Sequence, residues 1–493
     1  MSPSIISGII AVYFLFLILI SRLTARKADN ASFFLGNRSS PWFLVAFGMI
    51  GTSLSGVTFI SVPGWVASNQ FSYLQMVLGY LLGYLVVANV LMPLYYRLNL
   101  TSIYTYLEQR FGFWSYKTGA FYFLLSRTIG ASFRLFLVAN VLQMAVFDAW
   151  NIPYFLTVAI TILLIWVYTY KGGIKTIVWT DSLQTLFMLT AVGITIYQIG
   201  IRLDLNFFEL TETIKNSDYS KTFFFDDWKD GRFFWKQFLS GAFITIVMTG
   251  LDQDMMQKNL SCKNIKEAKW NMLSLSFILI IVNILFLSLG ALLFIYAKQM
   301  GINLPEKSDE LYPFLALGGE LGIWVAALFI LGLIAAAYSS ADSALTALTT
   351  SVCIDFLSVD KKTELDGTKL RKQVHVMMSF VIFLVIMLFS FINNDSVISS
   401  LFKAAGYTYG PLLGMYAFGL IHKYSIKDRF VPWVCLVSPL LTYAINYFSE
   451  ELFNGYQFGF EMIILNGLLT YLGLHLLRQK KTVNKNSIVT ALG

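Results

Sequence analysis

Long apolar segments alternate with short polar connectors along the whole chain of 493 residues. A helix needs about 20 mainly apolar residues to cross a bilayer. Thirteen segments come close to that length, and they cover residues 4–21, 41–66, 71–96, 117–146, 152–169, 175–199, 235–256, 270–298, 321–357, 373–392, 396–420, 430–449 and 458–477. No long linker or low-complexity block interrupts the series. The pattern therefore predicts an all-α polytopic membrane protein with 13 transmembrane helices, built as a single domain over residues 1–493.

The distribution of basic residues predicts how these helices are oriented. If the N-terminus lies outside, the cytoplasmic connectors hold 25 of the 36 Lys and Arg residues, the opposite connectors hold 8, and 3 lie within spans. Cytoplasmic connectors of membrane proteins carry an excess of Lys and Arg. We therefore expect an integral protein of the plasma (inner) membrane, with its N-terminus outside and its C-terminus in the cytoplasm.

Composition and spacing argue against several other classes of function. Hydrophobic residues make up 57% of the chain and charged residues 13%, and the net charge of +8 arises mainly in the connectors. That charge indicates membrane topology, so we expect no nucleic-acid binding. The three cysteines and three histidines have neither disulfide nor zinc-site spacing. No nucleophile–base set or phosphate-binding glycine loop is present, so we expect no enzyme. The oligomeric state stays open.

One predicted span, 321–357, carries a polar stripe. Its hydroxyls and acid are spaced i, i+3, i+4 and i+7, which puts them on one helix face: Ser339, Asp342, Ser343 and Thr346. Hydroxyls alone would fit close helix packing. A carboxylate in a span is costly, however, and normally faces a cavity or a partner. Since these oxygens suit a hard monovalent cation, the stripe indicates a cation site.

Two predicted spans contain helix-weakening residues at their middles. The second reads "GMIGTSLSGVTFISVPGW" from Gly48 onward, with four glycines and Pro63, and the seventh reads "TIVMTGLDQDMMQ" around Thr249 and Gly250. Broken helices release backbone carbonyls beside a cavity, and paired breaks in two halves of a chain are typical of transporter sites. The two breaks lie five spans apart, as an inverted five-plus-five repeat requires.

The sequence resembles the sodium:solute symporter family, whose members include galactose, proline and sialic acid symporters. Six motifs in the family's order carry the resemblance: "ADNASFFLGNRSSPW", "SLSGVTFISVPG", "TSIYTYLEQRFG", "GGIKTIVWTDSLQ", "GLDQDMMQKNLSCKNIKEAK" and "AAAYSSADSALTAL". The resemblance implies the leucine-transporter-like fold. In that fold, 4–21 is a leading helix, 41–200 and 234–420 are the two inverted repeats, and 430–477 forms two trailing helices.

The same resemblance implies a sodium site. Its ligands are the carbonyls of Gly51, Leu54 and Ala336 and the hydroxyls of Ser339 and Ser340. Some family members have a second cation site, which here implies Asp181, Ser339, Asp342 and Ser343. Asp342 stands where a serine can occur, so the number of coupling ions, and whether a proton takes part, stays open.

The family's substrate pocket is implied to include Ser53, Thr58, Arg127, Arg134, Met248 and Lys403. Met248 and Thr58 depart from the residues that bind a sugar in the galactose symporters, and Arg127 lies closest to an arginine that holds a substrate carboxylate in the sialic acid symporters. Arginine is the natural bidentate partner of a carboxylate. We therefore expect at least one of the three basic residues to contact the substrate. The alternative is that each bonds backbone carbonyls or an acid.

We thus expect a sodium-coupled symporter that imports a small polar organic solute, anionic like a carboxylate or a sialic acid, by alternating access. Two alternatives remain: a symporter for a neutral sugar or other neutral solute, and a transporter-like sensor that needs a separate signalling partner. The run "DQDMMQKN" is expected at the cytoplasmic end of its helix, with an i, i+4 pair between Asp254 and Lys258.

Overall fold

The computed structural model describes residues 2–24, 30–392 and 397–482. Arg26, Lys27 and Lys485, which the sequence assigns to cytoplasmic connectors, lie outside the described residues. The helices are α1 (Pro3–Thr24), α2 (Asn30–Leu35), α3 (Trp42–Asn69), α4 (Tyr73–Val86), α5 (Met92–Arg97), α6 (Thr105–Arg110), α7 (Phe113–Leu142), α8 (Tyr154–Arg202), α9 (Phe207–Lys215), α10 (Phe234–Thr245), α11 (Gln253–Leu260), α12 (Ile265–Gln299), α13 (Leu311–Leu317), α14 (Ile323–Ser351), α15 (Glu364–Ile392), α16 (Val397–Thr408), α17 (Gly410–Ile421), α18 (Val431–Tyr447), α19 (Ser449–Leu452) and α20 (Met462–Leu476). A short antiparallel pair joins β1 (Tyr424–Ile426) to β2 (Arg478–Thr482).

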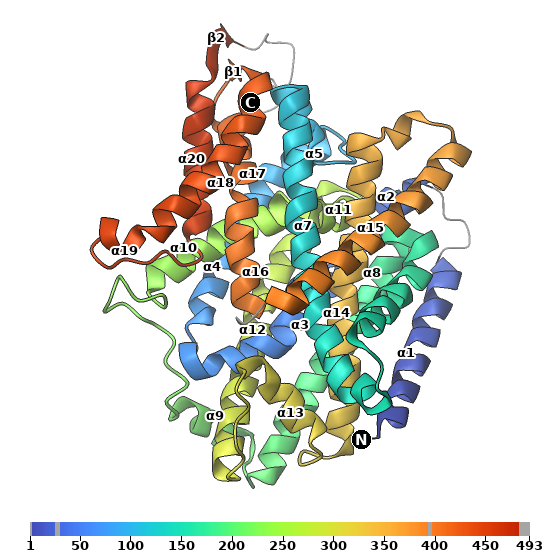
Figure 1. Cartoon of the computed structure of the whole chain (residues 1–493), viewed down its shortest axis with the longest axis vertical. Coiled ribbons are helices and arrows are strands. Elements are labelled where there is room, and N and C mark those ends of the chain that lie inside the picture. The colour runs from blue at the N-terminus through green and yellow to red at the C-terminus, as the bar shows by residue number, and fades with distance from the viewer. Residues whose placement is uncertain (1, 25–29, 393–396, 483–493) are drawn as a thin grey trace.

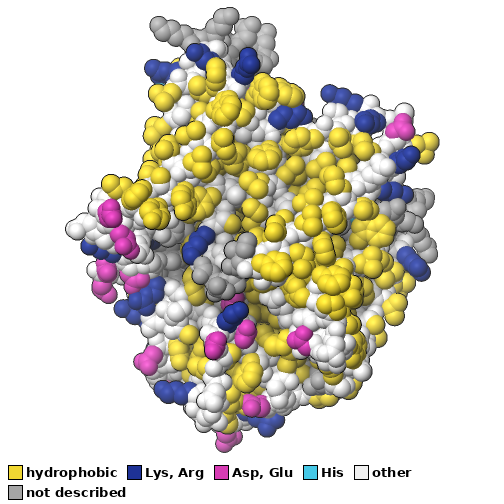
Figure 2. Space-filling view, viewed as in Figure 1, with side chains coloured by type: hydrophobic (Ala, Val, Ile, Leu, Met, Phe, Trp, Pro, Cys, Tyr) yellow, Lys and Arg dark blue, Asp and Glu magenta, His cyan; other side chains and the backbone are white. Residues whose placement is uncertain are grey.

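Many of these helices suit a lipid environment. In the described part of the chain, nine helices are long and apolar enough to cross a membrane, or ten if the bent pair α10–α11 counts as one span. Large apolar side chains such as Leu163 and Phe277 are 57% and 63% exposed. Figure 2 shows hydrophobic side chains over much of one face, with most charged side chains toward its ends and edges and some near its middle. The expectation of an all-α polytopic membrane protein is confirmed.

Helix α14 lies at the centre of the packing. It contacts α8, α3 and α7, and α3 in turn packs against α12 and α8 (Figure 1). The polar stripe of α14 is therefore enclosed by other helices instead of facing lipid, and Ser339, Asp342, Ser343 and Thr346 are completely buried.

Both interruptions expected from the sequence are present. Helix α3 is broken at Ser55, whose φ of 54° and ψ of 174° are not helical. The other break follows a π-helical turn at Ile246–Gly250, after which the axis of α11 is turned by 63° from that of α10. Asp252 restarts the helix, because its side chain accepts hydrogen bonds from the backbone N–H groups of Asp254 and Met255.

Helices α4 and α10 cross at unusually close range. A Cβ atom on Gly79 would collide with the backbone oxygen of Phe238, and one on Gly241 would collide with that of Met76. Small residues allow the backbones of membrane helices to approach closely. Helix α10, the first half of the broken span, is thereby fixed to α4.

Candidate functional site

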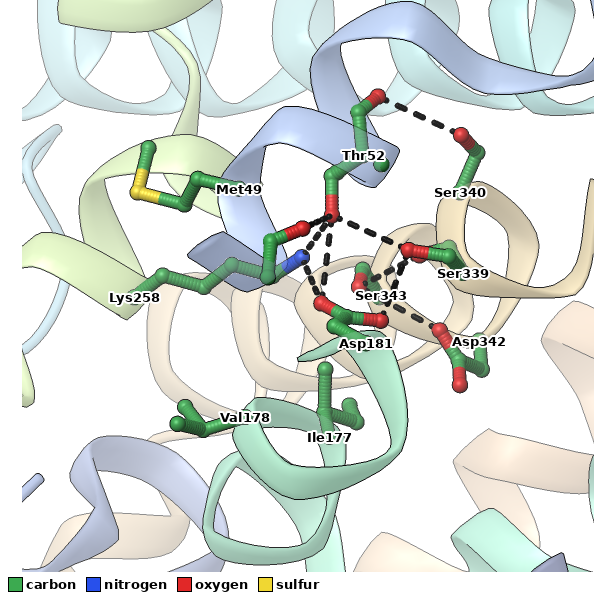
Figure 3. Close-up of polar contacts among 12 residues, drawn as sticks. Met49, Thr52, Ile177, Val178, Asp181, Lys258, Ser339, Ser340, Asp342 and Ser343 are labelled. Atoms are coloured by element: carbon green, nitrogen blue, oxygen red, sulfur yellow. Dashed lines mark hydrogen bonds and ion pairs between the residues drawn. The ribbon is translucent and has the colours of Figure 1, made fainter. Parts of the chain in front are cut away.

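Four helices bring polar side chains together beside the break in α3 (Figure 3). Lys258 of α11 donates to Asp181 of α8 over 2.5 Å and also to the hydroxyl of Thr52 on α3. The other carboxylate oxygen of Asp181 accepts a hydrogen bond of 2.8 Å from Ser339 on α14. Each of these four residues is at most 1% exposed. The centre of the protein thus contains an ion pair surrounded by hydroxyls.

The residues expected to bind sodium lie next to this cluster. Gly51, Leu54, Ala336, Ser339 and Ser340 are all buried, and Ser340 donates a hydrogen bond of 3.2 Å to the carbonyl oxygen of Thr52. A Cβ atom on Gly51 would stand 2.5 Å from the hydroxyl oxygen of Thr185 on α8 and 3.4 Å from that of Ser339 on α14, so Gly51 lies closely between these two helices. Hydroxyl and carbonyl oxygens are the donors that a hard cation prefers. The chemistry of this residue set fits sodium.

The residues of the expected second cation site are also brought together. Ser343 donates to the carbonyl oxygen of Ser339 over 2.8 Å and to a carboxylate oxygen of Asp342 over 3.2 Å. Ser339 links this pair to Asp181. The structure differs from expectation in that an ammonium group, that of Lys258, already lies against Asp181.

The sequence assigns Lys258 to a cytoplasmic connector, but the structure places it in the protein interior. Its side chain is 1% exposed, because the bend before α11 directs this half-helix into the interior. Without Lys258, the expected cytoplasmic connectors still hold 24 basic residues against 8 on the other side. The bias that predicts the orientation is therefore nearly unchanged.

A pocket adjoins the break in α3. Five of the six residues expected to contact substrate line it: Ser53, Thr58, Arg127, Arg134 and Met248. Three tyrosines of α4, together with Asn283 and Phe402, complete much of the wall. The pocket and the expected sodium ligands therefore share the short segment around Ser55.

Lys403 lies outside this pocket. On α16, Ile398, Leu401 and Phe402 line the pocket, whereas Lys403 is exposed. Successive residues of an α-helix point about 100° apart, so the neighbour of a lining residue can face away. The structure therefore does not support Lys403 as part of the substrate site.

The two arginines of α7 have different surroundings. The guanidinium group of Arg127 forms an ion pair with Asp254 and lies 3.8 Å from a carboxylate oxygen of Asp252. Asp252 also accepts a hydrogen bond of 2.5 Å from Tyr409. Nε and Nη1 of Arg134 are both buried without a hydrogen-bond partner among the described residues, whereas in Arg127 Nε lacks a partner but Nη2 is held by Asp254.

The expected pair between Asp254 and Lys258 is wrong. Asp254 pairs with Arg127 and Lys258 pairs with Asp181. Both side chains are buried, and a buried charge needs a close partner. Since α11 lies among α14, α3 and α8, those partners come from other helices.

Sequence reasoning missed Lys258, Asp252 and Tyr409 as members of the site. The available signal was the density of charge directly after the predicted break, where three ionisable residues occur between positions 252 and 258. Placing the membrane boundary at residue 256 left Lys258 outside the predicted span. Tyr409 carries no comparable signal, because aromatic residues are common throughout the chain.

Several known proteins are similar to this chain. A sodium/sialic acid symporter of Aliivibrio fischeri is 25% identical over 90% of this chain and 88% of its own length. Sodium-coupled monocarboxylate transporter 2 of Homo sapiens is 24% identical over 85% of this chain and 66% of its own length. The solved structure of a substrate-bound, outward-open Na⁺-coupled sialic acid symporter has a TM-score of 0.81 with 20% identity, covering 97% of this chain and 99% of that one. The model of the sodium:solute symporter family matches residues 33–424, so the chain belongs to the sodium:solute symporter family.

Proposed function

We propose that this sodium symporter imports a small organic anion bearing a carboxylate. Sodium binds between the broken helix α3 and α14, through the carbonyls of Gly51, Leu54 and Ala336 and the hydroxyls of Ser339 and Ser340. The anion binds in the adjoining pocket. The two sites share the segment around Ser55, so binding of one solute orders backbone that the other needs. This shared segment supplies the coupling.

The observation that carries the choice of an anion is the state of Arg134. Its side chain lines the pocket and is 5% exposed, yet Nε and Nη1 have no hydrogen-bond partner among the described residues. Buried donors normally have acceptors, and leaving one unsatisfied costs about 1–3 kcal/mol or more when it is charged. A carboxylate can accept two parallel hydrogen bonds from one guanidinium group.

Charge balance alone does not require an anion. Two arginines near the pocket would repel sodium if nothing compensated them, but Asp252 and Asp254 carry matching negative charges close to Arg127. The support for an anionic substrate therefore comes from the hydrogen-bond donors of Arg134 that have no acceptor. Arg127 acts by positioning the start of α11. The relatives named above transport sialic acids and monocarboxylates, which both carry a carboxylate.

For the finer architecture we propose 13 spans in a five-plus-five inverted repeat within one membrane domain over residues 1–493. Three shorter apolar helices, Tyr154–Val167, Gly410–Ile421 and Met462–Leu476, complete the ten longer spans. The start of α1 and strand β2 lie at opposite ends of the molecule (Figure 1), as an odd number of spans requires. The excess of basic residues supports an N-terminus outside and a C-terminus in the cytoplasm.

The test is uptake by purified protein in liposomes, with and without a sodium gradient, across carboxylic acids, sialic acids, amino acids and neutral sugars. For the best substrate, Arg134→Met should raise KM by an amount equivalent to roughly 2–5 kcal/mol. Sodium binding without substrate should change little, because Arg134 is not among the sodium ligands.

Arg110→Met is a matched control, because Arg110 is also a buried arginine but bonds backbone carbonyls of Gly419 and Tyr424 away from the pocket. It should leave substrate preference intact. If a neutral sugar competes as well as any acid, or if Arg134→Met leaves the KM for acids unchanged, the substrate is not an anion. If no solute moves with sodium, the protein works as a sensor.

A further inference from the structure

Lys258 occupies a place where a cation would otherwise bind. The residues around Asp181 supply oxygens from three helices, and the family resemblance assigned some of them to a second cation site. In the structure the ammonium group of Lys258 contacts Asp181 over 2.5 Å and also contacts the hydroxyl of Thr52. It is bound by the same kind of oxygens that would hold sodium, and it is 1% exposed.

The formal charges near the cluster support this reading. Asp181 carries a negative charge and Lys258 a positive charge, so the ammonium group already neutralises the carboxylate that it contacts. A second sodium ion would add a positive charge a few ångströms from the ammonium group, in a region where water does not screen the repulsion.

Lys258 also links three helices, because it belongs to α11 and contacts residues of α8 and α3. It lies on α11, the inner half of the broken span, whose axis is turned by 63° from α10. The salt bridge therefore ties this half-helix to α8, while Thr52 ties it to α3. A free ion could not provide such a link.

We propose that the ammonium group of Lys258 is a built-in cation that replaces a second sodium ion, so that the protein couples transport to one sodium ion per cycle. This inference rests on the sodium site of the proposed function. The alternative is a purely structural ion pair with no relation to sodium. The two differ in what happens when the ammonium group is removed: a cation site left vacant should accept sodium, whereas a structural pair should leave only an unpaired acid.

The experiment measures sodium binding to purified protein by equilibrium dialysis with ²²Na⁺, and thermal unfolding across sodium concentrations. The wild type should bind one ion with a Hill slope of about 1. Lys258→Met keeps most of the length of the side chain but removes its charge, so it should bind two ions. Its melting temperature should be lower than that of the wild type without sodium and should rise more steeply as sodium is added.

Two further variants control this result. Lys258→Met combined with Asp181→Asn removes both charges of the pair, so it should fold without sodium and again bind one ion. Lys236→Met replaces another buried lysine, whose ammonium group donates to the carbonyls of Lys229 and Gln457 far from Asp181. It should bind one ion with unchanged affinity.

Two sodium ions bound to the wild type would overturn the inference, and so would a single ion bound to folded Lys258→Met. If Lys258→Met stays unfolded at every sodium concentration while the double variant folds, sodium does not replace the ammonium group and the inference is also wrong. A wild type that binds no sodium at all would instead contradict the proposed sodium site.

Discussion

In this site, the number of hydrogen-bond partners that a side chain already has indicates whether it binds a solute or holds helices together. Arg127 and Arg134 lie on one helix and line one pocket. Arg127 is ion-paired with Asp254 and keeps one donor, Nε, without a partner, whereas both Nε and Nη1 of Arg134 lack partners among the described residues. Asp181 likewise collects hydrogen bonds from Thr52, Lys258 and Ser339. A group already satisfied by the chain holds helices together, whereas a group with spare capacity is available to a solute.

Removal of single hydroxyls tests the sodium site at this scale. Ser339→Ala and Ser340→Ala each delete one ligand oxygen without adding bulk. We expect each to weaken sodium binding about tenfold, in line with the loss of roughly 1–1.5 kcal/mol from one polar contact. The measurement is the sodium concentration needed to raise the melting temperature.

Ser276→Ala is the control for these two variants, because Ser276 is a buried serine of α12 that donates to the carbonyl of Leu273 in its own helix. Its sodium titration should match that of the wild type. Unchanged titrations for Ser339→Ala and Ser340→Ala as well would remove both residues from the site.

The helices themselves depend on a few small residues. Gly79 and Gly241 allow α4 and α10 to touch backbone to backbone, and no side chain fits at either position. Gly193 on α8 is different, because a Cβ atom there would meet nothing within 4 Å. Glycine is therefore required where α4 and α10 cross, whereas on α8 a larger residue fits at Gly193.

We expect Gly241→Ala to lower stability by about 1–3 kcal/mol, because the added methyl group forces the two helices apart. Gly193→Ala should be neutral or slightly stabilising, since alanine is the better helix former by up to about 1 kcal/mol. Thermal unfolding in detergent compares the two variants. Equal stability of both would show that the crossing of α4 and α10 tolerates separation.

Most elements could be predicted from hydropathy, and both breaks could be predicted from glycine, proline and hydroxyl content. The partners inside the site could not. Hydropathy places Lys258 at the membrane boundary, because a periodic pattern does not reveal a bend in the helix. The bend of 63° directs the two turns of α11 into the protein interior. The family resemblance assigns Lys403 to the pocket, but a one-residue difference in position turns a helical side chain by about 100°, and a resemblance between motifs does not resolve that difference.

At the scale of the whole molecule, charge and hydropathy predict an orientation. Exposed apolar side chains cover much of the face shown in Figure 2, and the excess of basic residues in alternate connectors predicts which side is cytoplasmic. The three cysteines Cys262, Cys353 and Cys435 are buried. Thiols introduced at exposed connectors can therefore report the orientation against a silent background.

Lys221 and Lys362 are suitable positions because both are exposed and lie in connectors assigned to opposite sides. Lys221→Cys should react with a membrane-impermeant maleimide in intact cells. Lys362→Cys should react only after the membrane is permeabilised, and the parent protein should not react in either case. The reverse pattern would mean that the protein is inserted with its N-terminus in the cytoplasm.

The close crossing of α4 and α10 has a consequence for movement. Helix α10 is fixed to α4 by backbone contact, and α11 is fixed to α8 by the Lys258–Asp181 ion pair. The two halves of the broken span are therefore anchored to different helices. If α4 and α8 move relative to each other, the backbone from Ile246 to Asp252 must change conformation, because it is the segment that connects α10 to α11. Stiffening that short segment should slow the transport cycle without changing what either half binds.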